Sequence, residues 1–417
     1  MKPLAGMKNF VWISLGSASN TLTSLFFLMI VTRTLGVNDA GIFAIAFTTA
    51  QILLTVGLYG IRNYQVTDLK DQFSSGIYIA LRVMTSVMMV VIGLIFCILS
   101  RYDLLKSQIV LILILYKMSE AISDVYYGIL QKKNKLYIVG FSMTLRSVLS
   151  LIFFFIYLAY VPQANLLTAC LGLMVTGYLP IILVDIPCAG RIEKTRPVFD
   201  KTEIGRLLSL CFPIFVVSFL SIIVVNIPKY IIDSSLSEEV QTIYNIIVMP
   251  GTSIALFSQI IVQSLLVRMA ESINRQSKTD FKKLIGSILL LVVLFTALFT
   301  VFCGFYGETL LYFLYKIDVA AYIPYLIVIV AGAMFSSIAN VFSVVLTALR
   351  KMNIQMYVYL ICLALSFPIC WLLIPQYSIA GASISYLLIM FIQFALCSAA
   401  CYTLYRKMIK NSGEPVS

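Results

Sequence analysis

The chain has 417 residues, of which 61% are hydrophobic and 12% charged, with a mean hydropathy of +0.99 and a net charge of +12. So few charges cannot cover a soluble protein of this size, and the composition indicates that most of the chain lies in lipid. The sequence has no histidine and no G-x-x-x-x-G-K-[ST] motif, which excludes Ser-His-Asp and Cys-His catalysis, histidine-liganded metals and a P-loop ATP motor.

Twelve apolar segments are long enough to cross a bilayer, which takes about 20 helical residues each. Helices are expected because backbone amides in lipid need internal partners, and the alternating pattern of a β-barrel is absent. The predicted class is an all-α integral membrane protein with twelve transmembrane helices, at 10–31, 40–61, 76–100, 107–130, 137–160, 165–186, 207–232, 240–268, 284–304, 320–348, 354–373 and 378–404. Ser17-Ala18-Ser19 could pass for a signal-peptidase site, but the apolar run continues to Val31, which favours a retained span.

The distribution of basic residues predicts the orientation of the spans. With the N-terminus inside, the cytoplasmic segments hold 22 of the 30 Lys and Arg residues, and the outer segments hold 5. Positive residues concentrate on the cytoplasmic side of membrane proteins, so both termini are predicted to be cytoplasmic. The basic net charge is thereby explained by topology, and no nucleic-acid partner is expected.

The loops are short, and the longest divides the chain into two halves of six spans. The predicted parts are an N-lobe at 1–188, a cytoplasmic linker at 189–206, a C-lobe at 207–404 and a cytoplasmic tail at 405–417. No loop is large enough for a soluble catalytic domain, so no enzyme activity is expected. Two halves of equal size predict a transporter built from pseudo-symmetric lobes.

The nine cysteines lie in or beside apolar runs, and none forms a C-x-x-C pair. They are interpreted as small buried hydrophobic residues, with neither a disulfide framework nor a metal site. No cofactor is expected. The cysteines are Cys97, Cys170, Cys188, Cys211, Cys303, Cys362, Cys370, Cys397 and Cys401.

Ionisable residues inside the spans are the main functional candidates, because each costs about 2.5–3.5 kcal/mol on insertion scales. Lys117, Glu120 and Asp124 share one face of the fourth span with Tyr127. The remaining clear cases are Arg82 in the third span and Arg146 in the fifth. Asp185 lies so close to the end of its span that an interfacial position is expected.

Depth along the spans, at about 1.5 Å per residue, predicts how these charges pair. Asp124 lies level with Arg82 and Glu120 level with Arg146. If both of these pairs form, Lys117 is left as the unpaired cation that faces a cavity. Two interpretations remain open. The five charges either form an ion-pair network that only clips the helices together, or they form a cationic substrate site with titratable acids beside it.

Lys229 follows Pro228 at the outer end of the seventh span. It is either a cation near the exit of the transport path or a lysine at a helix end that snorkels to the outer surface.

Several short motifs carry a family resemblance. They are Thr32-Arg33-Thr34-Leu35-Gly36, Asp39-Ala40-Gly41-Ile42-Phe43, Gly60-Ile61-Arg62-Asn63-Tyr64-Gln65-Val66-Thr67-Asp68, Gly128-Ile129-Leu130-Gln131-Lys132-Lys133 and Asn226-Ile227-Pro228-Lys229-Tyr230-Ile231-Ile232-Asp233. Together they resemble the bacterial polysaccharide flippases, of O-antigen and capsule type, in the multidrug/oligosaccharidyl-lipid/polysaccharide exporter superfamily. The resemblance covers the first eight spans, and the last four match by hydropathy only.

The resemblance implies a multi-pass carrier in the bacterial cytoplasmic membrane that works by alternating access. Its substrate would be undecaprenyl-diphosphate carrying an oligosaccharide repeat unit, moved from the inner to the outer leaflet for cell-surface polysaccharide synthesis. Members have a cationic lumen, which Arg82, Lys117 and Arg146 match by chemistry, while Glu120 and Asp124 depart from that picture. Lys229, near the exit of the path, is a further candidate for substrate binding. The expected partners are the lipid-linked substrate and membrane lipids, with H⁺ or Na⁺ and the polysaccharide polymerase machinery as further candidates.

With no ATP motif, export has to draw on an ion gradient or on removal of the product outside. Glu120 and Asp124 are the candidate ion-coupling residues, because they are the carboxylates deep within a span. Two alternative functions remain: an ion-coupled multidrug exporter of the same superfamily, and a non-catalytic membrane component of a glycan assembly complex. The fourteen-span lipid II flippases are disfavoured by the count of twelve.

Overall fold

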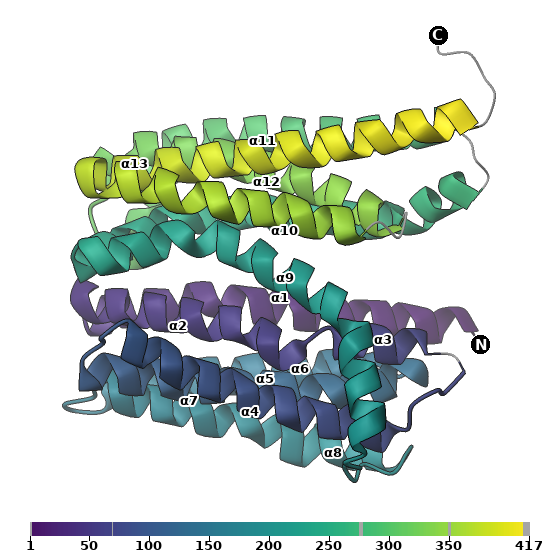
Figure 1. Ribbon diagram of the computed structural model, residues 1–417. Coiled ribbons are helices and arrows are strands. Elements are labelled where there is room, and N and C mark those ends of the chain that lie inside the picture. The colour runs from purple at the N-terminus through teal and green to yellow at the C-terminus, as the bar shows by residue number, and fades with distance from the viewer. Residues whose placement is uncertain (1, 69, 275–277, 349–351, 412–417) are drawn as a thin grey trace. The chain divides into compact units, whose positions relative to one another are not determined.

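A computed structural model describes the chain except for residues 1, 69, 275–277, 349–351 and 412–417. The described residues contain helices and no strand, as the apolar spans predict (Figure 1). The elements are α1 (Lys2–Thr34), α2 (Val37–Leu58), α3 (Ile61–Thr67), α4 (Ser75–Leu99), α5 (Leu104–Lys132), α6 (Leu136–Tyr160), α7 (Leu166–Pro180), the π-helical turn η1 (Ile181–Asp185), α8 (Ile186–Gly190), α9 (Lys201–Ser235), α10 (Glu238–Asn274), α11 (Lys278–Tyr315), the 3₁₀ turn η2 (Ala320–Tyr322), α12 (Ile323–Ala348) and α13 (Met352–Asn411).

In the described part of the chain, nine helical stretches are long and apolar enough to cross a membrane. Neither α5 nor α10 is among them, and α13 counts as one stretch although its backbone leaves helical geometry at Ser378. The all-α membrane class is confirmed, while the count of twelve spans stays a prediction. The end of the predicted cytoplasmic tail, 412–417, lies outside the described residues.

The chain divides into two compact units, Met1–Phe219 and Leu220–Ser417. The division falls within α9, after the non-helical stretch 191–200 that the sequence predicts as part of a linker. The predicted lobe boundaries stay predictions.

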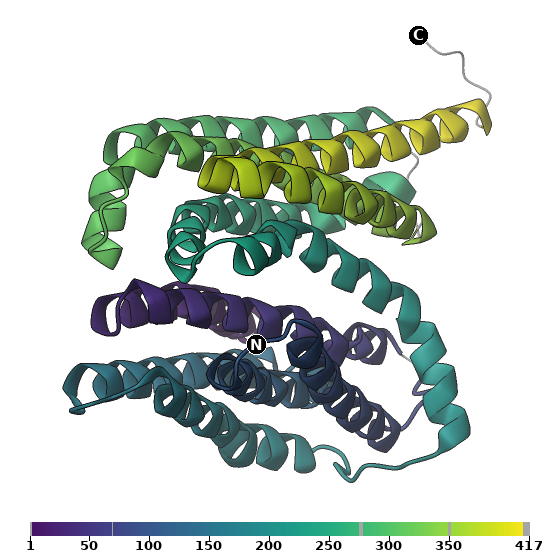
Figure 2. The same cartoon turned by 60° about the vertical axis from the view of Figure 1, so that its left-hand side comes forward.

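In the first unit, α5 packs against α2, α4 and α7, and α1 lies along α6 (Figures 1 and 2). The apolar part of α5 is fully buried at Ile109, Leu113 and Ile114. Phe27 of α1 and Phe154 of α6 meet edge to face, with 5.0 Å between their ring centroids. Apolar contacts therefore enclose α5, and its polar face is held inside the same bundle.

The second unit is built around α12, which packs against α10, α11 and α13. Ile288 of α11 and Val341 of α12 are fully buried there. Gln355 donates hydrogen bonds to the hydroxyl oxygens of Ser343, at 3.1 Å, and Thr347, at 2.9 Å, so polar contacts as well as apolar ones join α12 to α13.

All nine cysteines are free, and seven of them are buried. The burial of these seven agrees with their interpretation as small hydrophobic residues.

The crossing of α1 and α6 depends on two glycines. A Cβ atom at Gly140 would lie 2.0 Å from the carbonyl oxygen of Trp12, and one at Gly16 would lie 2.7 Å from the carbonyl oxygen of Gly140. The two backbones can approach this closely only because neither position has a side chain, a common device of membrane helix pairs.

We expect Gly140→Ala to destabilise the protein by about 1–3 kcal/mol, because the new methyl group meets backbone that cannot yield. Thermal unfolding of the purified protein in detergent measures the change. Gly205→Ala in α9 is the matched control, since a Cβ there meets no atom within 4 Å. Equal unfolding temperatures for wild type and Gly140→Ala would contradict the close crossing.

Candidate functional site

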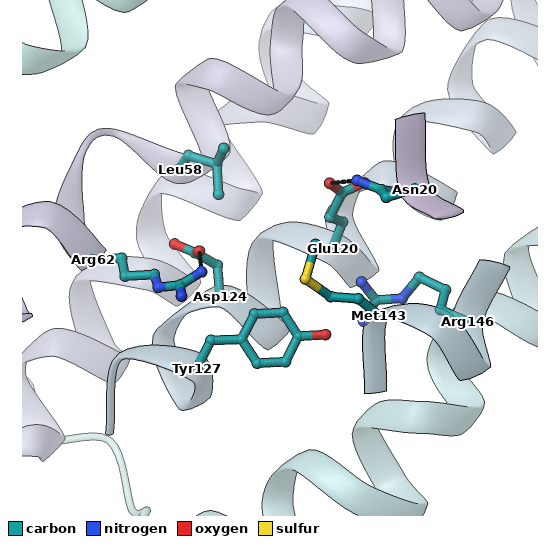
Figure 3. Close-up of a pocket in the computed structure, with 8 residues that line it drawn as sticks. All are labelled: Asn20, Leu58, Arg62, Glu120, Asp124, Tyr127, Met143 and Arg146. Carbon is teal, nitrogen blue, oxygen red and sulfur yellow. Dashed lines mark hydrogen bonds and ion pairs between the residues drawn. The ribbon is translucent and has the colours of Figure 1, made fainter. Parts of the chain in front are cut away.

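A polar pocket of about 180 Å³ lies within the first unit (Figure 3). Five helices contribute its lining: α1, α2, α3, α5 and α6. The lining residues are Asn20, Leu58, Arg62, Glu120, Asp124, Tyr127, Met143 and Arg146. Two guanidinium groups and two carboxylates therefore meet in one hollow of a helical membrane bundle.

The polar face of α5 forms one wall of this pocket. Glu120, Asp124 and Tyr127 all line it, as their helical spacing predicts. Lys117 belongs to the same face but does not line the pocket, because its ammonium group is enclosed near the Phe47 ring, 5.0 Å from the ring centroid.

Asp124 is bridged by two arginines from different helices. Arg82 of α4 donates to Oδ2 at 2.6 Å, which confirms the predicted pair, and Arg62 of α3 approaches Oδ1 at 3.3 Å. Arg82 is 1% exposed and also donates to the carbonyl oxygen of Gly57 at 2.5 Å. Its guanidinium group is therefore engaged by protein behind the pocket, and it is not part of the lining.

Arg62 is a charged pocket residue that the pattern of intramembrane charges does not predict, and in the sequence it stands out only within the family motif from Gly60 to Asp68. Its side chain is 24% exposed, and its guanidinium group donates twice to Gln131, at 2.7 and 3.1 Å. The signal that could have found it is Gly60, whose φ of 69° follows the positive φ of Tyr59. These two left-handed residues end α2 and start α3 in a new direction, which brings Arg62 to the pocket.

Glu120 does not pair with Arg146, contrary to the prediction. It accepts from Lys117 at 2.9 Å and from Asn20 of α1 at 3.0 Å. Residues three apart on one helix are neighbours, so Lys117 reaches Glu120 without any help from another helix. Lys117 is therefore paired, and the prediction that it is the unpaired cation of the cavity is wrong.

Arg146 instead contacts residues that are not part of the pocket lining. Its Nη2 lies 3.9 Å from Oδ2 of Asp185 and donates to the Ser123 hydroxyl, and its Nε donates to the carbonyl oxygen of Gly177 at 3.3 Å. Asp185 is fully buried in the bundle, whereas the sequence predicts an interfacial position for it.

Lys229 lies on α9 in the second unit and is not among the residues that line this pocket. In the part of the chain that the structure describes, no three His, Cys, Asp or Glu residues are grouped so that they could hold a metal ion.

A model of the polysaccharide biosynthesis protein family matches residues 7–273, a range that contains every residue of the pocket. The capsular polysaccharide biosynthesis protein CapF of Staphylococcus aureus is 25% identical over 383 residues, which cover 91% of this chain and 95% of CapF.

Among solved structures, the lipid II flippase MurJ in an inward closed conformation matches with a TM-score of 0.73 and 16% identity, over 95% of this chain and 87% of MurJ. An inward-facing multidrug resistance MATE family transporter of the MOP superfamily matches with a TM-score of 0.72 and 10% identity, over 97% of this chain and 100% of that transporter. At these identities the likeness shows a shared fold.

We expect Glu120→Gln to destabilise the protein by roughly 3–5 kcal/mol, because it leaves the ammonium group of Lys117 buried and without its counter-charge. The double variant Lys117→Met/Glu120→Gln removes both charges and should recover most of that loss. Thermal unfolding in detergent measures both. If the single variant is as stable as wild type, the pair does not neutralise a buried charge.

Proposed function

The chain belongs to the family of polysaccharide biosynthesis proteins, and we propose that it is a flippase for undecaprenyl-diphosphate-linked oligosaccharide repeat units. It moves them from the inner to the outer leaflet of the bacterial cytoplasmic membrane by alternating access, and so supplies cell-surface polysaccharide synthesis. The family match confirms the resemblance read from the sequence. The shared fold of MurJ and the capsular role in the name of CapF support the assignment.

The observation that carries this proposal is the pair of arginines in the pocket. Arg62 comes from α3 and Arg146 from α6, so two guanidinium groups line one cavity from opposite ends of its wall. A diphosphate head group cannot cross hydrocarbon without a polar, charged environment. Arginine holds phosphate oxygens through two parallel hydrogen bonds, which suits a diphosphate better than a point charge does.

Arg82 and Lys117 have supporting roles in this proposal. Arg82 fixes Asp124, which in turn orients Arg62, and Lys117 compensates Glu120. Arg82 and Lys117 therefore contribute to substrate binding indirectly, by holding Asp124 and Glu120 in place. Lys229 remains a candidate cation elsewhere on the transport path.

Glu120 and Asp124 are the proposed coupling residues, with H⁺ or Na⁺ as the ion. Both are partly open to the pocket, with 19% and 16% of their side chains exposed, so an ion could reach either one. The same two carboxylates favour the second candidate function, an ion-coupled exporter of cationic drugs. That alternative would need the carboxylates, and not the arginines, to face the substrate.

Twelve spans remain the proposed topology, in two halves of six with both termini cytoplasmic. The break at Ser378 separates the predicted spans 354–373 and 378–404 within α13, and α5 and α10 contain the spans 107–130 and 240–268. Adding α5 and α10 to the nine apolar stretches, and dividing α13 at Ser378, gives twelve spans.

We expect Arg62→Gln and Arg146→Lys each to weaken binding of a prenyl-diphosphate-linked sugar about tenfold or more, because each loses a charge-assisted bidentate contact. Binding to the purified protein in nanodiscs and glycan export in cells are the two readouts. Arg191→Gln, at an exposed arginine of the linker, is the matched control. Unchanged binding and export in both pocket variants would refute the flippase site. Resistance to cationic drugs that depends on Glu120 and Asp124 would support the exporter instead.

A reporter fused after Lys410 should be cytoplasmic, and one inserted at Ser234-Ser235 should be external, because of the positive charge bias. Protease protection in sealed vesicles measures both. An external C-terminus would contradict the twelve-span topology.

A further inference from the structure

Asp185 is a fully buried carboxylate that lines no part of the pocket but stands behind one of its arginines. Its Oδ2 lies 3.9 Å from Nη2 of Arg146 and accepts a hydrogen bond from Ser123 at 2.6 Å. Arg146 also donates to that Ser123 hydroxyl, so Ser123 links the two charged groups. Arg146 itself lines the pocket, so one side chain connects the pocket with the buried Asp185.

The backbone around Asp185 is unusual in a way that favours a role beyond packing. Asp185 ends η1, a π-helical turn that follows Pro180 and packs against both α5 and α6. Such turns are rare and occur often at functional sites. Its second oxygen, Oδ1, is buried without a hydrogen-bond partner among the described residues, an arrangement that costs stability and calls for a functional reason.

We propose that Asp185 is a positioning residue that competes with the diphosphate of the substrate for Arg146. This inference rests on the proposed function, because it assumes that Arg146 contacts the diphosphate. A negative charge behind the guanidinium group cancels part of its positive field at the pocket, and in a low dielectric this weakens the grip on an anion. A carrier needs such moderation, since a site that binds too tightly cannot release its cargo.

The competition has a directional consequence that a purely structural residue would not have. Replacing Asp185 by the nearly isosteric asparagine keeps a hydrogen-bond partner for Ser123 and leaves the bond from Arg146 to Gly177 in place. The positive field of Arg146 at the pocket then increases. Loss of packing can only weaken substrate binding, whereas loss of a competitor strengthens it.

The experiment measures binding of a prenyl-diphosphate-linked sugar to purified variants in nanodiscs, together with transport in proteoliposomes. We expect Asp185→Asn to tighten binding by about three- to thirtyfold, the range for removing one charge at several ångströms in a partly screened site. KM should fall, and kcat should fall with it, because release becomes slower. The double variant Arg146→Gln/Asp185→Asn lacks both charges and should bind more weakly than wild type.

Asp71→Asn is the matched control, because it removes a carboxylate that pairs with Lys132 at 2.6 Å in an exposed loop outside the pocket. It should leave both affinity and transport unchanged. Unchanged or weaker binding by Asp185→Asn would overturn the inference, provided that Arg62→Gln weakens binding. If Arg62→Gln and Arg146→Lys also leave binding unchanged, the proposed function itself has failed.

If Asp185→Asn lowers the unfolding temperature, the ligand-induced shift of that temperature still reports affinity. At equal concentrations of the same probe, the rise in unfolding temperature must then be larger for Asp185→Asn than for wild type. A smaller shift means that Asp185 only supports the fold, and the inference is wrong.

Discussion

The need to compensate charged side chains inside a membrane bundle determines how the first unit is built. An unpaired ion in this environment is strongly unfavourable, so each charge on the polar face of α5 has a partner on the same helix or on a neighbouring one. Asp124 takes Arg62 and Arg82, and Glu120 takes Lys117. These pairs fix α3 and α4 against α5, and they decide which charged groups are left to face the pocket.

The resulting pocket is balanced in charge, with two arginines and two carboxylates in its lining. This lining suits the proposed anionic head group only if neighbouring side chains already neutralise both carboxylates. Asn20 and Lys117 hold Glu120, and two arginines hold Asp124. Because two arginines share the single negative charge of Asp124, this group keeps one net positive charge, whereas Glu120 and Lys117 cancel each other.

Asp185 provides a further case of charge compensation, farther from the pocket. Arg146 is compensated by Asp185, a fully buried carboxylate that is not part of the pocket lining. The two pocket arginines thus differ in their counter-ions. Asp124, the partner of Arg62, is itself part of the pocket, and Asp185, the partner of Arg146, is sealed inside the bundle. Under the proposed function, a substrate that enters the pocket meets Asp124 directly and affects Asp185 only through the guanidinium group of Arg146.

The sequence by itself determined the all-helical membrane class, the family, and the placement of Glu120, Asp124 and Tyr127 on one face of α5, because apolar length and helical periodicity are local properties of the chain. It also gave the pair of Asp124 with Arg82. Only the tertiary structure decided that Arg62 enters the pocket, that Glu120 takes Lys117, and that Arg146 takes Asp185. Counting depth along separate spans places residues at similar levels, but it does not give the rotation of each helix or the reach of each side chain. The turn at Tyr59 and Gly60 and the π-helical turn at Asp185 change those directions. Ion pairs depend on distances of a few ångströms, so their partners follow from packing rather than from sequence position.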